Sequence, residues 1–132
     1  AVSRVQLGCL DALRNNPGRL GFNALNDLAM HFTAIELDRL HFKRIERNIG
    51  RWFPHSIGHH LGLDLHDCPL QSRYDSSFEA GNVITVEPGL YIPDDDLDAP
   101  AEYRGLAVRI EDDIVLSTQG IEMLTSISDD YL

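Results

Sequence analysis

Four of the six histidines in this 132-residue sequence lie within twelve residues, at positions His55, His59, His60 and His66. The surrounding stretch, residues 53–67, reads F-P-H-S-I-G-H-H-L-G-L-D-L-H-D and mixes imidazoles with glycines and apolar side chains. A single histidine is more often a structural residue, but a cluster of them can bind a divalent metal and exchange protons near neutral pH. The stretch therefore indicates a half-buried polar cleft.

Two glutamates supply matching carboxylates. Glu87 ends the apolar run V-I-T-V, and a carboxylate at the end of a buried strand must be paired, protonated or bound to a metal. In V-R-I-E-D-D-I-V-L, alternation places Glu111 on one strand face with Arg109, and Val108 and Ile114 on the other. An ordinary ion pair explains Arg109 and Glu111 equally well. One histidine with two carboxylates is a ligand set for a divalent metal.

Other functional classes fit the sequence less well. It contains no H-E-x-x-H, G-x-S-x-G or P-loop motif. Residues 1–54 carry eight Lys and Arg against five acidic residues, whereas residues 55–132 carry three against sixteen, so a nucleic-acid partner is disfavoured. No apolar run of about 18 residues predicts a membrane span. Cys9 and Cys68, which lie far apart and outside any C-x-x-C pattern, are expected to be reduced thiols.

Helices are expected in the first part of the chain. A first helix is predicted before the N-N-P-G turn at residues 15–18, because apolar residues recur there at helical spacing: Val2, Val5, Cys9 and Leu13. A second is expected to begin with Asn23 as its N-cap, and its apolar stripe is Leu25, Leu28, Ala29 and Phe32. These two helices should pack on a common sheet. A third is expected within residues 35–47, ended by Gly50.

Strands and loops are expected in the second part. Short apolar runs bounded by Gly and Pro predict strands at residues 83–87, 107–117 and 120–126. The acidic loop at residues 93–100 is expected to be solvated, with cation binding as the weaker alternative. Residues 1–50 are thus mainly helical and residues 51–132 mainly strands and loops. This order of elements favours a single α+β domain over a doubly wound fold.

The three motifs, H-S-I-G-H-H-L-G-L-D-L-H-D, V-I-T-V-E-P-G-L-Y-I and V-R-I-E-D-D-I-V-L, resemble in order and spacing the C-terminal catalytic half of the Xaa-Pro aminopeptidases (aminopeptidase P). Residues 91–113 are especially similar to the branch of Xaa-Pro aminopeptidase 3 and intermediate-cleaving peptidase. The resemblance is strong over residues 55–111 and, before residue 51, rests on helix placement and the N-P-G turn. It implies an α+β fold: the C-terminal portion of a pita-bread metallopeptidase fold, with helices packed on a curved, mainly antiparallel sheet. Residues 1–132 would then form a partial peptidase catalytic domain.

The resemblance also implies a metal centre. His59, Glu87 and Glu111 would be metal ligands, with Glu87 beside the nucleophilic water as general base and Glu111 bridging two ions. The cofactors would be two divalent metal ions, Mn(II) first, with Zn(II) and Co(II) as alternatives. Such ions activate water and polarise a scissile carbonyl.

Further roles follow from the same resemblance. His55 and His66 would be catalytic, non-ligand histidines that contact the substrate and stabilise the transition state. Tyr91 and Arg109 match positions that orient the ligands. His60 stands where the family usually has an aromatic residue, so it is expected in the pocket wall rather than as a ligand.

The implied activity is the removal of the N-terminal residue from peptides with proline in second position, in a mitochondrial or cytoplasmic protein compatible with a homo-oligomer. The family site needs two further aspartates from the preceding half of its fold, and Asp11, Asp27 and Asp38 lie in helical patterns that do not match them. We therefore expect a fragment that alone binds metal weakly or not at all, lacks peptidase activity and exposes apolar surface. The alternative is a non-catalytic pita-bread binding module.

Overall fold

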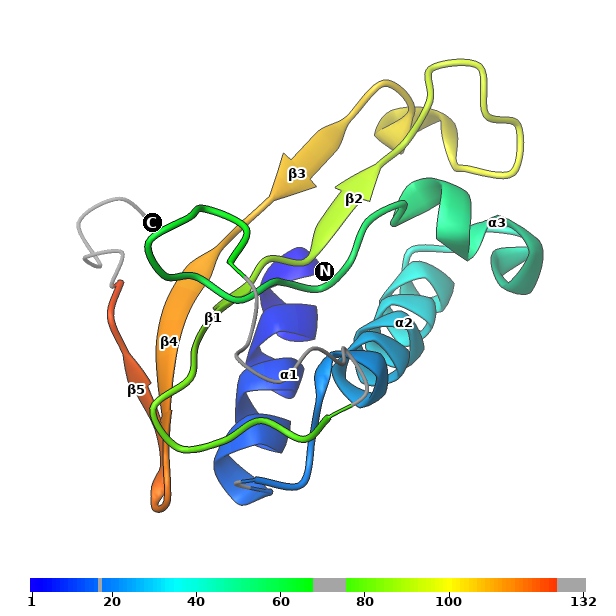
Figure 1. Ribbon diagram of the computed structural model, residues 1–132. Coiled ribbons are helices and arrows are strands. Elements are labelled where there is room, and N and C mark those ends of the chain that lie inside the picture. The colour runs from blue at the N-terminus through cyan, green and yellow to red at the C-terminus, as the bar shows by residue number, and fades with distance from the viewer. Residues whose placement is uncertain (17, 68–75, 126–132) are drawn as a thin grey trace.

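The computed structural model describes residues 1–16, 18–67 and 76–125, and helices precede strands along the chain. The helices are α1 (Val2–Asn15), α2 (Phe22–Arg39) and α3 (Ile45–Trp52). The strands are β1 (Val83–Val86), β2 (Gly89–Tyr91), β3 (Ala107–Arg109), β4 (Asp112–Ser117) and β5 (Gly120–Met123), with a 3-10 turn, η1 (Ala101–Tyr103), before β3 (Figure 1). Among the described residues, no helix combines the length and apolar character needed to cross a membrane.

The strands form two antiparallel sheets. In the first sheet β4 lies between β1 and β5, and in the second β2 pairs with β3. The strand predicted over residues 107–117 is thus two strands with different partners. The break follows from the opposite segment, where Pro88 has no N–H to donate and interrupts the ladder between β1 and β2. Figure 1 shows both ribbons bending together at this point.

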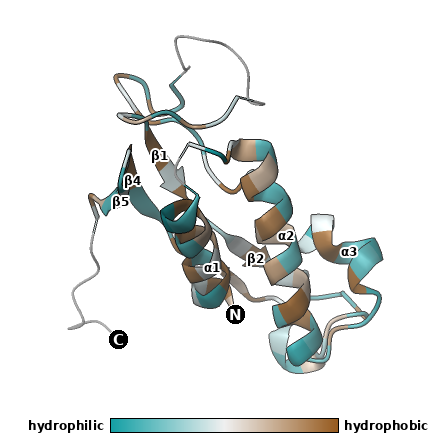
Figure 2. Ribbon diagram, turned by 90° about the horizontal axis from the view of Figure 1, so that it is seen from below, coloured by the Kyte–Doolittle hydropathy of each residue, from teal (hydrophilic) through white to brown (hydrophobic). Residues whose placement is uncertain are grey.

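The core lies between the first sheet and the helices. Figure 2 shows α1 between this sheet and α2, with α3 on the far side of α2. The predicted first helix is confirmed as α1. The two helices were expected to pack on a common sheet, but α2 packs mainly on α1 and α3. Cys9 is fully buried in this core as a free thiol, and burial raises its pKa to about 12. Cys68 lies outside the described residues.

Two helix boundaries differ from the predictions. Helix α2 is capped by the backbone of Gly21 rather than by Asn23, and it continues to Arg39. The predicted third helix over residues 35–47 is wrong, because the chain turns with positive φ at His41 and Arg44 before α3 begins. Helix α3 has an apolar stripe of side chains at helical spacing, Ile45, Ile49 and Trp52. These three side chains pack in a second core cluster. Gly50 lies inside α3, where its exposed side faces open space.

The acidic loop at residues 93–100 is anchored to α3. Asp96 is buried and accepts a hydrogen bond of 2.7 Å from the Trp52 indole N–H. Asp98 forms an ion pair of 3.1 Å with Arg44 at the start of α3. The prediction of a solvated loop is therefore wrong for these two carboxylates, because α3 supplies donors that a sequence pattern does not reveal.

Candidate metal centre

Residues 57–61 run antiparallel along the free edge of β1 and bring the histidine stretch to the end of that strand. The Thr85 N–H donates to the His59 carbonyl at 3.0 Å, and the Glu87 N–H donates to the Ile57 carbonyl at 2.7 Å. Because side chains alternate along an extended segment, His59 and His60 face opposite sides. This pairing places His59 beside Glu87.

Gly58 permits the close approach of these two segments. A Cβ atom at this position would lie 2.0 Å from the Thr85 carbonyl oxygen and 3.1 Å from the Thr85 hydroxyl oxygen. Any side chain there would push the histidine segment away from β1. The glycine in S-I-G-H-H is thus required by the spacing between the two segments.

Three side chains from separate segments converge at this point. His59, Glu87 and Glu111 each offer a ligand atom, and these atoms all lie within 4.8 Å of one another. The His59 Nε2 atom is 3.3 Å from Glu87 Oε1. Glu111 arrives at the junction of β3 and β4, opposite the end of β1. Among the described residues, this is the one group of three such side chains that could hold a metal ion.

The His59 ring is oriented by a backbone carbonyl. Its Nδ1 atom is 2.9 Å from the carbonyl oxygen of His60. A carbonyl only accepts hydrogen bonds, so Nδ1 must carry the proton. In the neutral ring, the Nε2 lone pair is then left facing Glu87, as in metal-binding histidines whose second nitrogen is held by a carbonyl.

The Glu87 carboxylate is buried, at 8% exposed, and has two further partners. The Thr85 hydroxyl donates to its Oε1 atom at 3.0 Å, and Arg109 Nε lies 3.6 Å from its Oε2 atom. Thr85 also accepts the backbone N–H of His59 at 3.0 Å. Sequence reasoning missed Thr85 by treating V-I-T-V as an apolar run. A polar residue two positions before Glu87, on the same strand face, was the available signal.

Glu111 lies in a repulsive environment. Burial of its carboxyl group raises its pKa, and the negative charges of Glu87 and Asp113 raise it further. Arg109 and His59 act in the opposite direction without cancelling the shift. Arg109 makes its ion pair with Glu87, which lies between β1 and β2. The site therefore holds two acidic groups that a cation would stabilise.

The two accessory histidines flank this group differently. The ring of His66 is exposed and lies 4.4 Å from that of His59, centroid to centroid. His55 donates from Nδ1 to the Ser56 carbonyl at 2.8 Å, and its buried Nε2 atom has no hydrogen-bond partner among the described residues. Such an orphaned buried nitrogen is suited to bind a group from outside the chain.

Tyr91 and Gly89 shape the surroundings of His55. The Tyr91 ring lies 5.5 Å from the His55 ring, and the Arg109 guanidinium lies 5.8 Å from the Tyr91 ring centre. A Cβ atom at Gly89 would lie 2.9 Å from both His55 Nε2 and the Tyr91 hydroxyl. Tyr91 and Arg109 are thus brought to the site, and Gly89 leaves room for them.

His60 is turned away from the ligand group. Its ring makes edge contacts with Phe22 at 5.1 Å and Phe78 at 6.1 Å, on the helix side of the segment. Burial lowers its pKa, with a smaller opposing effect from Asp67. His60 therefore lies in a cluster of aromatic rings, on the side of the segment away from the ligand group.

The family follows from comparison with known proteins. The sequence profile of metallopeptidase family M24 matches residues 2–118. The chain belongs to metallopeptidase family M24. Intermediate cleaving peptidase 55 of Saccharomyces cerevisiae is 36% identical over 126 residues, which is 95% of this chain and 24% of that protein. Xaa-Pro aminopeptidase 1 of Streptomyces coelicolor is 51% identical over 79 residues, 58% of this chain and 16% of that protein.

Solved M24 structures confirm the predicted fold. The crystal structure of Icp55 from Saccharomyces cerevisiae matches with a TM-score of 0.82 and 34% identity, covering 94% of this chain and 29% of that one. The α+β pita-bread architecture and the resemblance to Xaa-Pro aminopeptidases are thereby confirmed. The chain spans 13 to 24% of the length of the curated relatives it matches.

The donor set fits the divalent metal of an M24 metallopeptidase. Two carboxylates and an imidazole are the ligands that Mn(II), Zn(II) and Co(II) accept. The close approach of the Glu87 and Glu111 carboxylates and the oriented His59 nitrogen are features of this chain's own structure that a cation would satisfy. We therefore take these three side chains as the candidate metal centre.

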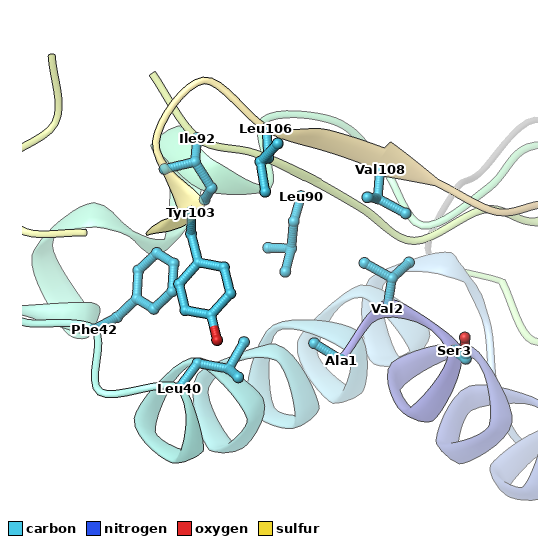
Figure 3. Close-up of a pocket in the computed structure, with 10 residues that line it drawn as sticks. All are labelled: Ala1, Val2, Ser3, Leu40, Phe42, Leu90, Ile92, Tyr103, Leu106 and Val108. Carbon is cyan, nitrogen blue, oxygen red and sulfur yellow. The ribbon is translucent and has the colours of Figure 1, made fainter. Parts of the chain in front are cut away.

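An apolar hollow lies apart from this centre. A cavity of about 380 Å³ lies between the β2–β3 sheet and the ends of α1 and α2. Leu90 and Val108, which pair across the two strands, point into it (Figure 3). Val108 is 51% exposed, so it does not share the buried face of Ile114 as alternation over one strand predicted. Tyr91 and Arg109, the next residues along, lie on the opposite face with Glu87.

Proposed function

We propose that this chain carries part of the active site of a metal-dependent Xaa-Pro aminopeptidase, which removes the N-terminal residue from peptides with proline in second position. The observation that supports this most directly is the convergence of His59, Glu87 and Glu111 within 4.8 Å. Family membership and the names of the relatives support the reaction and the substrate class. Residues 1–132 are proposed to act as one partial catalytic domain.

The three converging side chains would hold the metals. His59 offers Nε2 because its Nδ1 proton is used by the His60 carbonyl, and Glu87 and Glu111 offer carboxylate oxygens. When bound, two divalent ions would supply the activation of a water and the polarisation of the scissile carbonyl. We propose Mn(II), with Zn(II) or Co(II) as alternatives.

Glu87 is proposed as the general base. Its carboxylate is buried, and the Thr85 hydroxyl and Arg109 hold it in one orientation. A base held in this way can take the proton of the attacking water and later deliver it to the leaving nitrogen. Arg109, on β3, places a positive charge 3.6 Å from Glu87 Oε2.

His55 and His66 are proposed to contact the peptide. The Nε2 atom of His55, which has no hydrogen-bond partner among the described residues, can hydrogen-bond to a peptide group, and the exposed ring of His66 lies beside that of His59. Tyr91 packs on His55 and would hold its ring in place. A solved structure of Icp55 from Saccharomyces cerevisiae, which has a TM-score of 0.81 and 35% identity to this chain, is bound to the inhibitor apstatin.

The compartment is proposed as mitochondrial or cytoplasmic. The relative from Arabidopsis thaliana is named a mitochondrial intermediate cleaving peptidase 55, and the Streptomyces relatives are bacterial proteins. A homo-oligomer is compatible with the proposed enzyme.

Calorimetry of the 132-residue chain is the first test. The structure brings together three ligands where the resemblance implies five, so we expect binding of Mn(II) weaker than micromolar and no peptide cleavage. Glu87→Gln should weaken the residual binding further. Binding of two ions with micromolar affinity by this chain would contradict the proposed ligand count.

A chimera provides the test of activity. Residues 1–125 would replace the matching segment of yeast Icp55, and release of the first residue from an Xaa-Pro-Xaa peptide would be measured with and without a chelator. We expect chelator-sensitive cleavage that falls by about a thousandfold or more in Glu87→Gln. The matched control is Glu79→Gln, which changes an exposed glutamate. A folded chimera that binds the peptide without cleaving it would favour a non-catalytic binding module instead.

A further inference from the structure

We propose that Thr85 is a positioning residue of the metal centre, which fixes His59 and Glu87 relative to each other through its single hydroxyl group. The inference rests on the proposed function, because it concerns how two of the proposed ligands are held. It goes further by identifying a neutral residue, outside the ligand set, on which the separation of the two ligands depends.

The direction of the two hydrogen bonds is fixed by elementary donor and acceptor counting. The backbone N–H of His59 has only a proton to give, so at 3.0 Å it occupies a lone pair of the Thr85 hydroxyl. The hydroxyl proton is then free for the second neighbour, Glu87 Oε1, also at 3.0 Å, and a carboxylate can only accept it. One oxygen atom therefore links the backbone of one ligand to the carboxylate of another.

The burial of Thr85 keeps water away from both hydrogen bonds. Thr85 is 1% exposed, and its neighbours Ile84 and Val86 are fully buried on the other face of β1. Alternation places Thr85 on the same face as Glu87, one pleat away. Because water has little access, a lost bond here cannot be replaced by a solvent molecule, and both partners would be left unsatisfied.

The hydrogen bond from Thr85 fixes the rotation of the Glu87 carboxylate. The His59 Nε2 atom lies 3.3 Å from the same oxygen, Oε1, that receives the Thr85 proton. Without that proton, Glu87 keeps only the longer contact of its other oxygen with Arg109, at 3.6 Å. The carboxylate would then rotate, and the histidine segment would lose one of its ties to β1.

Two substitutions at Thr85 and one matched control test the proposal in the 132-residue chain. Thr85→Val keeps the shape and removes the hydroxyl, whereas Thr85→Ser keeps the hydroxyl. Thr33→Val makes the same chemical change at a threonine that is also 1% exposed but lies on α2. Amide hydrogen exchange of His59, and the broadening of amide signals near the site by added Mn(II), are measured by NMR in all four proteins.

We expect Thr85→Val to speed exchange of the His59 amide and to weaken Mn(II) binding by about tenfold, as loss of a partner that orients a ligand commonly does. Thr85→Ser should restore both, and Thr33→Val should change neither. Unchanged exchange at His59 in Thr85→Val would overturn the proposed link. Faster exchange with unchanged Mn(II) broadening would overturn the positioning role. Absence of broadening around His59 in the unaltered chain at any Mn(II) concentration would overturn the positioning role of Thr85 in this chain. The proposed function fails separately, if the chimera shows no chelator-sensitive cleavage.

Discussion

Two groups of carboxylates in this chain are built on opposite principles. Asp96 and Asp98, in the loop before β3, are surrounded by donors from α3, with the Trp52 indole at 2.7 Å and the Asn48 amide at 2.9 Å. Glu87 and Glu111 instead lie close together where the two sheets meet. One group is satisfied by the fold itself, and the other is left with excess negative charge.

The pKa values move in opposite directions for this reason. Burial by itself would raise the pKa of Asp96, but hydrogen bonds from Trp52 and from the Asp98 backbone, together with the charge of Arg51, lower it. Burial also raises the pKa of Glu111, and there the neighbouring acids add to the effect. The surroundings of the two carboxyl groups thus decide the direction, because donors lower the pKa of Asp96 whereas neighbouring acids add to the rise at Glu111.

The difference separates structural acids from candidate functional ones. A carboxylate that already has its donors stabilises the fold and has little capacity for a ligand. Carboxylates held together against their repulsion cost stability, and such a cost is typical of sites that bind a cation. Cation binding by the acidic loop was the weaker alternative in the sequence, and two of its aspartates are instead held by donors from α3, whereas the two separate glutamates meet at His59.

Trp52→Phe should remove a donor from Asp96 and have the largest effect on the free energy of unfolding. The substitution removes the indole donor from a buried carboxylate and leaves space around a fully buried ring. We expect the free energy of unfolding to fall by about 3 kcal/mol, from the lost hydrogen bond and the imperfect packing together. Urea unfolding followed by far-UV circular dichroism measures this, because Trp52 is the chain's single tryptophan and its fluorescence would be lost. A change below about 1 kcal/mol would mean that the indole bond contributes little.

The paired substitutions Asp96→Asn and Glu111→Gln sharpen the comparison, since each exchanges a carboxylate for an amide of the same shape. In Asp96, one oxygen accepts from Trp52 and the other from the Asp98 N–H at 3.0 Å, so an amide NH₂ must face one of these donors. We expect a loss of about 2 kcal/mol. Glu111→Gln relieves repulsion with Glu87, and because the residue is largely exposed we expect a change within about 0.5 kcal/mol, in the stabilising direction. Equal losses in the two variants would remove the distinction drawn here.

The sequence was informative where the chemistry is local. Spacing predicted the first helix and the strand before Glu87, and the motifs indicated which histidine and glutamates to compare. It did not predict the anchoring of Asp96, because Trp52 lies 44 residues away and only the fold brings the two together. Thr85 was visible as a polar residue in V-I-T-V, but its contact with the His59 backbone depends on Gly58 allowing the neighbouring segment to approach.

The pH dependence of the free energy of unfolding should show the smallest effect, which the Asp96→Asn variant assigns to Asp96. Because the folded pKa of Asp96 lies below its unfolded value, its ionised form stabilises the fold fully above about pH 4. That contribution is lost as the pH falls through the folded pKa. Glu36, paired with Arg4 and Arg39, also has a lowered pKa, so the unaltered chain loses stability over the same range from two sources. We therefore expect the difference in unfolding free energy between the unaltered chain and Asp96→Asn to shrink as the pH is lowered from 5 toward 2, whereas Glu36 contributes equally to both. A difference that stayed constant with pH would show that the cost of Asp96→Asn comes from the geometry of the amide rather than from the charge that the donors of α3 stabilise.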